Sequence, residues 1–326
     1  MRGRAIGLGL LGLGAFLLAA AFAVRLLLEP ALVKLPLDQT ASPTATGTDI
    51  DFFDLAAQKQ LHGLTVDVRQ QVQGDPDSEA ASDDVAVWNF GSTISDSDGE
   101  LLNAGTYRVC IDRRSAVAVD CDVDNVDDDG DIPVEGLTLT FPFGTEKRDY
   151  DFFNSTAKKA SPATFEGVET INGLEVYRFE MSIPETVIRS TEVPATMAGG
   201  DAADGSVEAD VVYSNERTIW VEPTSGVIVT AEEHPDTVLR GPDGETGVTI
   251  LAGDFAGTDE TIAAGVERAE DTRSKITMVS TVLPLSLAVL GLLLLVVGAL
   301  LVRRARPVAD EDDTFDTAPV REPQVQ

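Results

Sequence analysis

The longest uncharged apolar stretch of the chain runs from Ile276 to Val302, with the sequence ITMVSTVLPLSLAVLGLLLLVVGALLV. A helix needs about 20 apolar residues to cross the hydrocarbon core of a bilayer, so this stretch predicts a transmembrane helix. A long buried core helix has the same apolar signature. Arg303, Arg304 and Arg306 follow directly, and an excess of Lys and Arg marks the cytoplasmic end of a span. The chain is therefore expected to cross from outside to inside at residues 276–302.

A second apolar stretch, residues 5–28, follows Arg2 and Arg4. A cleavable signal peptide fits it, because Ala21-Phe22-Ala23 resembles a cleavage site. An uncleaved signal anchor fits better, because the apolar core is longer than the roughly 7–15 residues of a signal peptide. Under both interpretations residues 1–4 stay in the cytoplasm, and the chain that follows the apolar stretch lies outside the membrane. Four glycines (Gly7, Gly9, Gly12, Gly14) give a small-residue face for helix packing, although glycine is frequent in membrane helices generally.

Between the two spans the hydrophobic pattern changes to alternation of single polar and apolar residues. It is clear at residues 65–69, 84–90, 137–141 and 174–179. Strict alternation predicts strands with one buried and one solvated face. No crossover helices separate these runs, so antiparallel pairing is expected. The sequence therefore predicts a mainly β fold with terminal transmembrane helices.

The strand region also contains an internal correspondence, which suggests duplication. Four segments recur in the same order: 49–54 with 149–154 (DIDFFD, DYDFFN), 57–59 with 157–159 (AQK, AKK), 87–90 with 176–179 (VWNF, VYRF), and 107–119 with 217–229. We therefore expect two duplicated antiparallel β units, 49–148 and 149–257. Each would be a curved sheet, and the turn in WVEPTSG is similar to hairpins in bacterial lipoprotein-carrier folds.

Three segments outside the β units are assigned from composition. Residues 29–48 are polar and contain Pro, as in a tether. Residues 258–275 predict a juxtamembrane helix with Thr258 as its cap, although Gly265 also suits a flexible stalk. Residues 303–326 are acidic and contain Pro, which predicts a disordered cytoplasmic tail. The sequence thus predicts a plasma-membrane protein with residues 30–275 extracytoplasmic and both termini cytoplasmic.

Charge narrows the functional classes. The 326 residues include 55 acidic and 24 basic ones, for a net charge of −31. Nucleic-acid binding needs a basic surface, so it is not expected. The two His residues leave little for zinc or for His-based catalysis. No GxSxG, HExxH, P-loop or CxxC motif occurs, and the abundant carboxylates single out no catalytic pair, so an enzyme is not expected.

The two cysteines, Cys110 and Cys121, flank a predicted hairpin that turns near residues 113–116. Such a hairpin would place the two side chains opposite each other. Disulfides persist outside the cytoplasm, so we expect a disulfide bond, with two free thiols as the alternative.

An acidic run follows the second cysteine. Asn125, Asp127, Asp129 and Asp131, with Gly130, resemble the start of a calcium-binding loop. The run departs from that pattern because Asn comes first and Gly136 occupies the twelfth position. A solvated acidic loop explains the run equally well, and no other cofactor is expected.

Aromatic residues on the alternating runs could line an apolar ligand site. The candidates are Trp88, Phe90, Tyr177, Phe179 and Trp220. Ordinary core packing is the alternative role for each of them. The ligand of such a site would be a lipid or another envelope component, and the sequence does not specify an oligomeric state.

Three segments, DYDFFNSTAKKASPATFEG, GLEVYRFEM and RTIWVEPTSGVIV, together with the two terminal anchors, resemble an actinobacterial membrane-protein family whose members carry the label porin PorA family protein. The resemblance covers nearly the whole chain and implies a channel in the cell envelope. The alternating runs are shorter than the roughly 9–11-residue strands of a transmembrane barrel. We therefore expect an extracytoplasmic binding or scaffold domain, with a channel as the alternative and a hydrolase less favoured.

Overall fold

The computed structural model describes residues 2–54 and 57–304. The chain divides into two compact units, which are described separately: residues 29–278, here called the β domain, and a helical unit of residues 2–28 and 279–304. The predicted disordered tail from residue 305 onward lies outside the described residues.

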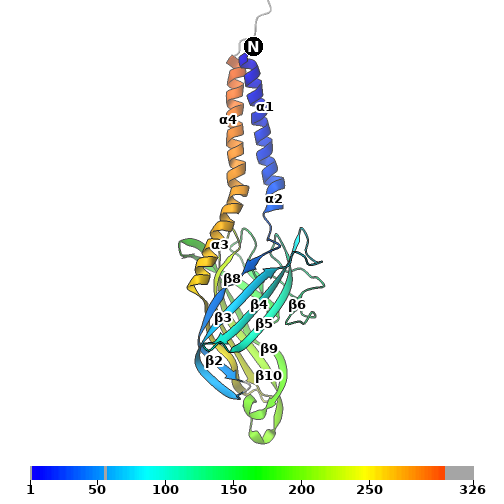
Figure 1. Ribbon diagram of the computed structural model, residues 1–326, viewed down its shortest axis with the longest axis vertical. Coiled ribbons are helices and arrows are strands. Elements are labelled where there is room, and N and C mark those ends of the chain that lie inside the picture. The colour runs from blue at the N-terminus through cyan, green and yellow to red at the C-terminus, as the bar shows by residue number, and fades with distance from the viewer. Residues whose placement is uncertain (1, 55–56, 305–326) are drawn as a thin grey trace, which may run out of the picture. The chain divides into compact units, whose positions relative to one another are not determined.

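The helical unit contains α1 (Arg2–Ala23) and α4 (Leu283–Arg304), which lie side by side (Figure 1). A π-helical turn adjoins each of them, at Val24–Leu28 and Met278–Val282. Both helices are long and apolar enough to cross a membrane. Their sidedness is a prediction from sequence alone.

Glycines bring the two helices of this unit together. A Cβ on Gly14 would lie 2.7 Å from the carbonyl oxygen of Gly291, and one on Gly7 would lie 2.9 Å from that of Gly298. Both pairs are spaced by seven residues and run in opposite directions, so α1 and α4 pack as antiparallel neighbours along a glycine seam. Close backbone approach of this kind is how small residues support helix pairing in membranes.

Replacing Gly14 with leucine is expected to push α1 and α4 apart, because the new Cβ would lie 2.7 Å from the Gly291 carbonyl oxygen and 3.0 Å from the Leu295 amide nitrogen, and backbone atoms cannot rotate away. We expect a cost of about 1–3 kcal/mol in helix pairing. Gly12→Leu is the matched control, since a Cβ there meets nothing within 4 Å. Pulsed EPR between one spin label on each helix measures the separation, and equal distances in both variants would contradict the seam.

The β domain begins with the short helix α2 (Glu29–Leu32) and contains one twelve-stranded sheet. The strands are β1 (Thr40–Ala41), β2 (Thr44–Asp54), β3 (Lys59–Gly74), β4 (Val85–Asp96), β5 (Leu101–Asp112), β6 (Asn125–Val126), β7 (Tyr150–Asn154), β8 (Lys159–Ile171), β9 (Leu174–Pro194), β10 (Ser206–Val221), β11 (Ile228–Arg240) and β12 (Thr246–Gly257). Two 3₁₀ turns, Ala195–Ala198 and Ala202–Asp204, join β9 to β10.

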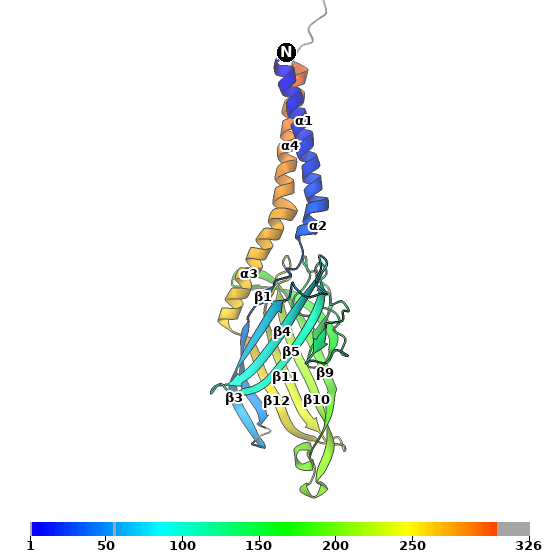
Figure 2. The same cartoon turned by 45° about the vertical axis from the view of Figure 1, so that its right-hand side comes forward.

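The strands are in the order β6-β5-β4-β3-β2-β12-β11-β10-β9-β8-β7, and β1 pairs with β3 off this path. The named strand pairs are antiparallel, as predicted. The sheet curves into a half-barrel (Figures 1 and 2). Leu137 links its edges, because it bridges Val117 on one side and Phe152 of β7 on the other. The two expected β units therefore share one continuous sheet.

The matching segments of the sequence fall on comparable strands. Segments 49–54 and 149–154 lie on β2 and β7, 87–90 and 176–179 lie on β4 and β9, and 107–112 and 217–222 begin on β5 and β10. Two consecutive four-stranded meanders thus carry the repeat in the same order. Duplication predicts this placement, and it stays a prediction.

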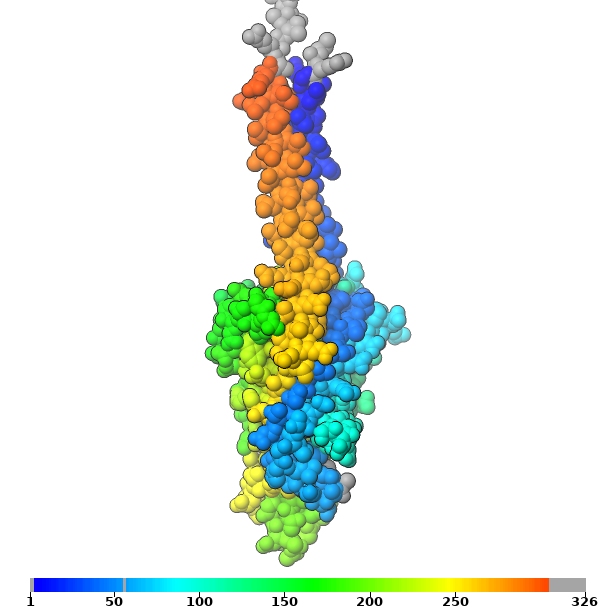
Figure 3. Space-filling model, turned by 60° about the vertical axis from the view of Figure 1, so that its left-hand side comes forward, coloured from blue at the N-terminus to red at the C-terminus, as the bar shows by residue number. Residues whose placement is uncertain are grey.

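Helix α3 (Asp259–Thr277) follows β12 and covers the range in which the sequence predicts a helix. The Thr258 hydroxyl caps it by accepting a hydrogen bond from the Thr261 amide at 3.2 Å. The Thr261 hydroxyl bonds in turn to the Thr44 carbonyl at 2.8 Å, where β2 begins. Gly265 allows close packing, since a Cβ there would lie 2.5 Å from the Val229 carbonyl oxygen. In Figure 3, α3 (gold) lies along the β domain beside the N-terminal strands (blue).

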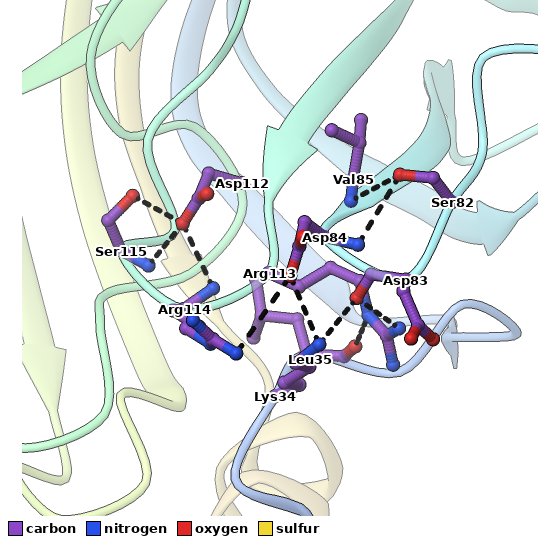
Figure 4. A network of polar contacts seen from close by, with 10 residues as sticks. All are labelled: Lys34, Leu35, Ser82, Asp83, Asp84, Val85, Asp112, Arg113, Arg114 and Ser115. Carbon is purple, nitrogen blue, oxygen red and sulfur yellow. Dashed lines mark hydrogen bonds and ion pairs between the residues drawn. The ribbon is translucent and has the colours of Figure 1, made fainter. Parts of the chain in front are cut away.

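Part of the expected tether is built into the β domain. Leu35 is buried, and β2 already begins at Thr44. Figure 4 shows the network that holds this segment. Arg113 donates to the carbonyl oxygens of Leu35 at 2.6 Å and Asp83 at 2.9 Å, and its own carbonyl accepts from the Leu35 amide at 2.7 Å. The side chain of Asp112 accepts from the Ser115 amide and organises the adjacent turn.

The predicted disulfide between Cys110 and Cys121 is confirmed. The chain turns after β5, and the Val119 amide donates to the Cys110 carbonyl at 2.8 Å, which brings the second cysteine back alongside the first. Cys110 is fully buried. The bond therefore ties the segment that links the sheet edges to β5, the strand beside the edge strand β6.

Removing the disulfide with Cys110→Ala and Cys121→Ala is expected to cost about 3 kcal/mol of unfolding free energy, because the sequence separation of 11 closes a short loop. Denaturant unfolding of the full chain in detergent measures this loss. Reduced wild-type protein is the control and should match the double variant, whereas an unchanged midpoint in both samples would argue against a stabilising role.

Candidate ligand cavity

The concave side of the half-barrel encloses a cavity of about 890 Å³. Its lining comes from both halves of the sheet, including β3, β4 and β5 on one side and β10, β11 and β12 on the other, and from α3. A volume of roughly 300–1,000 Å³ is typical of small-molecule sites. All lining residues belong to the β domain.

Strand alternation supplies the apolar part of the wall. On β3, Val68 and Val72 face the cavity, and on β4, Trp88, Phe90 and Ile94 do so. The intervening β3 residues point outward and are exposed, among them Asp67, Arg69, Gln71 and Gln73. Lipid-facing strands of a membrane barrel carry apolar side chains, so the outer face of β3 suits water.

One end of the cavity is closed by the segment that Arg113 holds. Lys34, Leu35 and Pro36 line the cavity, and the indole Nε1 of Trp88 donates to the Pro36 carbonyl at 3.1 Å. The Lys34 ammonium lies 3.1 Å from the Asp84 carboxylate. Residues that the sequence assigned to a tether thus form part of the wall.

A polar cluster interrupts the apolar lining on β10 and β11. The Arg217 guanidinium lies 3.1 Å from the Glu233 carboxylate, and the Asn215 amide donates to the same carboxylate at 3.1 Å. Asn154 donates to the Tyr213 hydroxyl at 3.2 Å. Burial raises the pKa of Tyr213 to about 12, with a smaller contribution from the charge of Glu233. Tyr213 therefore stays neutral and acts as a hydrogen-bonding group of the wall.

Tyr107 behaves similarly across the cavity. Burial raises its pKa well above its ordinary value, although the Arg217 charge opposes the shift. Its ring lies 4.8 Å from that of Phe90. Neutral aromatic groups of this kind contact apolar ligand atoms and offer a hydroxyl at the edge of the site.

The charge of the lining is opposite to that of the chain. Five cationic side chains and two acidic ones face the cavity, namely Lys34, Lys158, Arg189, Arg217 and Arg268 against Asp127 and Glu233. The chain as a whole carries a net charge of −31. The cavity therefore has a mixed apolar and polar lining with a local excess of positive charge.

The structure brings two of the five predicted lining residues to the cavity, Trp88 and Phe90. Phe179 is fully buried in the core, where its ring lies 4.8 Å from that of Phe141. Tyr177 is half-buried against the same core cluster, and its ring lies 5.4 Å from that of Phe165. Trp220 packs on the other face of β10, where its Nε1 donates to Glu169 at 2.8 Å.

The predicted calcium loop uses its side chains within the protein. Asp127 accepts from the Thr106 amide at 2.9 Å, Asp129 accepts from the Asp131 amide at 3.0 Å, and Asn125 donates to the Val123 carbonyl at 3.3 Å. Across residues 2–54 and 57–304, no group of three or more His, Cys, Asp or Glu side chains is placed to hold a metal ion. Calcium binding stays a prediction.

Sequence reasoning missed the charged part of the wall. Tyr213, Asn215 and Arg217 share one face of β10 with the apolar residues Val211 and Ile219, so alternation alone does not reveal them. Arg268 lies on α3, where only the packing of the helix decides which residues face the cavity. The signal available in the sequence was the polar series Tyr213, Asn215 and Arg217, which lies at every second position between Val211 and Ile219.

Comparison with known proteins gives matches that extend over both apolar helices and the β domain. The family model described as Porin PorA matches residues 6–300. A protein named Porin PorA from Corynebacterium amycolatum is 26% identical over 377 aligned positions, covering 90% of this chain and 97% of its own length. A second Porin PorA, from Corynebacterium resistens, is 26% identical over 306 positions, covering 70% and 74%.

Among solved structures, an exported protein with a YmcC-like fold from Bacteroides fragilis covers 69% of this chain and 96% of its own, at 9% identity and a TM-score of 0.19. That score is too low to indicate a shared fold. The family match instead extends over both apolar helices and the whole β domain, and the chain therefore belongs to the Porin PorA family.

Proposed function

We propose that the protein is anchored in the plasma membrane by α1 and α4 and that its β domain binds an apolar or amphiphilic envelope molecule in the internal cavity. The observation that carries the proposal is the 890 Å³ space lined by Trp88, Phe90 and the valines of β3. A buried apolar wall with a few polar groups is the usual form of a small-molecule site.

The outer face of the sheet supports a water-exposed position for the β domain. Besides β3, strand β11 presents Glu232, His234 and Asp236 outward, and all three are exposed. Arg303 and Arg304 in the last turn of α4 support cytoplasmic termini and an extracytoplasmic β domain. Protease added to intact cells should then cleave within residues 30–275 and spare both helices, whereas a shielded middle would reverse this topology.

The binding proposal is tested through Trp88. The chain has two tryptophans, so the Trp220→Phe variant leaves Trp88 as the only one, and Trp88 lines the cavity. A dibrominated fatty-acid methyl ester, titrated into the full chain in detergent, should quench Trp88 fluorescence saturably. Quenching that rises only linearly with the ester concentration would show that no acyl chain enters the cavity.

Channel formation is the second candidate, and family membership favours it. Two relatives are named porins, and they cover most of this chain. Two helices cannot enclose a pore by themselves, so a pore lined by α1 and α4 would require several copies of the chain. Conductance of the purified full chain in planar bilayers tests this candidate. Discrete single-channel steps would support it, and silence at high protein concentration would remove it.

A further inference from the structure

Arg268 is the one cavity-lining cation that is half-buried and has no hydrogen bond or ion pair with any described residue. Lys34 and Arg217 each have a carboxylate partner, Asp84 and Glu233. Arg189 and Lys158 are exposed to solvent. Burying a cation without a partner is unfavourable, so such a residue in a cavity wall suits an anionic ligand.

The position of Arg268 follows from the packing of α3. Thr261, Gly265, Arg268 and Thr272 recur at helical spacing and form the stripe of α3 that lines the cavity. The opposite side of this contact is fixed by Val266 and Ala269, which are buried against Val229 of β11. The packing of α3 on β11 therefore places the residue Arg268 in the cavity wall.

The carboxylate at i+3 helical spacing from Arg268 already has a partner. Asp271 lies three residues after Arg268, and it pairs with Lys275 at 2.6 Å. Thr272, one turn after Arg268, adds a hydroxyl donor on the same stripe. A guanidinium and a hydroxyl on adjacent turns can bind a carboxylate or a phosphate oxygen.

We propose that the cavity binds an anionic amphiphile, with its carboxylate or phosphate headgroup on Arg268 and its acyl chain along Trp88, Phe90 and Val72. This assignment rests on the proposed ligand-binding function and names its chemical class. The apolar wall accounts for the chain, and the excess of cations over acidic groups in the lining accounts for the charge.

The experiment compares two probes that differ only in charge, 9,10-dibromostearic acid and its methyl ester, by quenching of Trp88 in the full-length Trp220→Phe protein. We expect the acid to bind about tenfold more tightly than the ester, as one charged hydrogen-bonded contact supports. Arg268→Gln should remove this preference by weakening the acid and leaving the ester unchanged. Arg69→Gln, which removes one exposed positive charge from the outer face of β3, should keep the preference.

The outcomes separate the two proposals. Equal affinity for acid and ester in the parent protein would overturn the role of Arg268 while leaving acyl binding in place. Absence of saturable quenching by either probe would overturn both. An equal loss of acid and ester binding in Arg268→Gln would show a packing role instead. Inorganic phosphate alone should not displace the acid, and displacement at equimolar phosphate would assign the residue to a free anion.

Discussion

Gly226→Ala is expected to destabilise the β domain by about 3–5 kcal/mol, a large share of a typical stability of about 5–15 kcal/mol. Gly226 has φ 70°, a conformation that costs a residue with a Cβ roughly 1–2 kcal/mol. A Cβ there would also lie 2.1 Å from the carbonyl oxygen of Phe141. The clash is with backbone, so the segment that carries the fully buried Phe141 would have to move.

The affected contact joins distant parts of the chain. The Phe141 amide donates to the Gly226 carbonyl at 2.9 Å, and the Thr140 hydroxyl donates to the same oxygen at 3.0 Å. Thermal unfolding of the full chain in detergent, followed by circular dichroism, should show a midpoint lowered by roughly 10 °C or more.

Gly144→Ala is the matched control for this prediction. Gly144 also has φ 70°, but a Cβ there meets nothing within 4 Å. Gly144→Ala should therefore lower the free energy of unfolding only by the cost of the positive φ angle, about 1–2 kcal/mol. Equal losses in the two variants would mean that the Phe141 contact contributes nothing beyond backbone strain.

Ser92→Phe is expected to block ligand binding in the cavity, with a loss of affinity of at least about thirtyfold, or roughly 2 kcal/mol. Ser92 faces the cavity between Phe90 and Ile94 on β4. Its sheet neighbours are Gln70 on β3 and Gly105 on β5. Because Gly105 has no side chain, the new ring would occupy ligand space rather than displace the core.

Thr93→Phe is the control, because Thr93 lies on the same strand but is exposed on the outer face. Native mass spectrometry of the full chain measures how much lipid remains bound to each variant. Lipid at the bilayer-facing helices should be the same in both, so only cavity ligand is lost in Ser92→Phe. Equal retention in the two variants would place the bound lipid outside the cavity.

Local patterns determined the main elements of this protein. The charge-free run 276–302 and residues 5–28 are long apolar stretches, which require no knowledge of neighbours to be recognised as helices able to span a bilayer. Alternation correctly predicted strands at residues 65–69, 84–90 and 174–179, since side chains of a strand point to opposite faces whatever the strand pairs with. The same pattern was wrong at residues 137–141, where only Leu137 forms isolated bridges and no strand is present. The spacing of Cys110 and Cys121 around a turn predicted their disulfide, because a hairpin aligns residues by local geometry.

The single continuous sheet, the cavity and the positive charge of its lining could not be predicted from the sequence, because they depend on the tertiary structure. The order of strands depends on pairing between residues far apart, such as β2 with β12, for which alternation contains no information. Trp88 and Trp220 both sit on alternating strands, yet one lines the cavity and the other packs on the opposite face, because the curvature of the assembled sheet sets which face encloses space. From the sequence alone, Arg268 is one of several charged residues on a helix expected to face solvent. The close packing of Gly265 against β11 places Arg268 in the cavity wall. Only in that position does the lack of an acidic partner among the described residues indicate an anionic ligand.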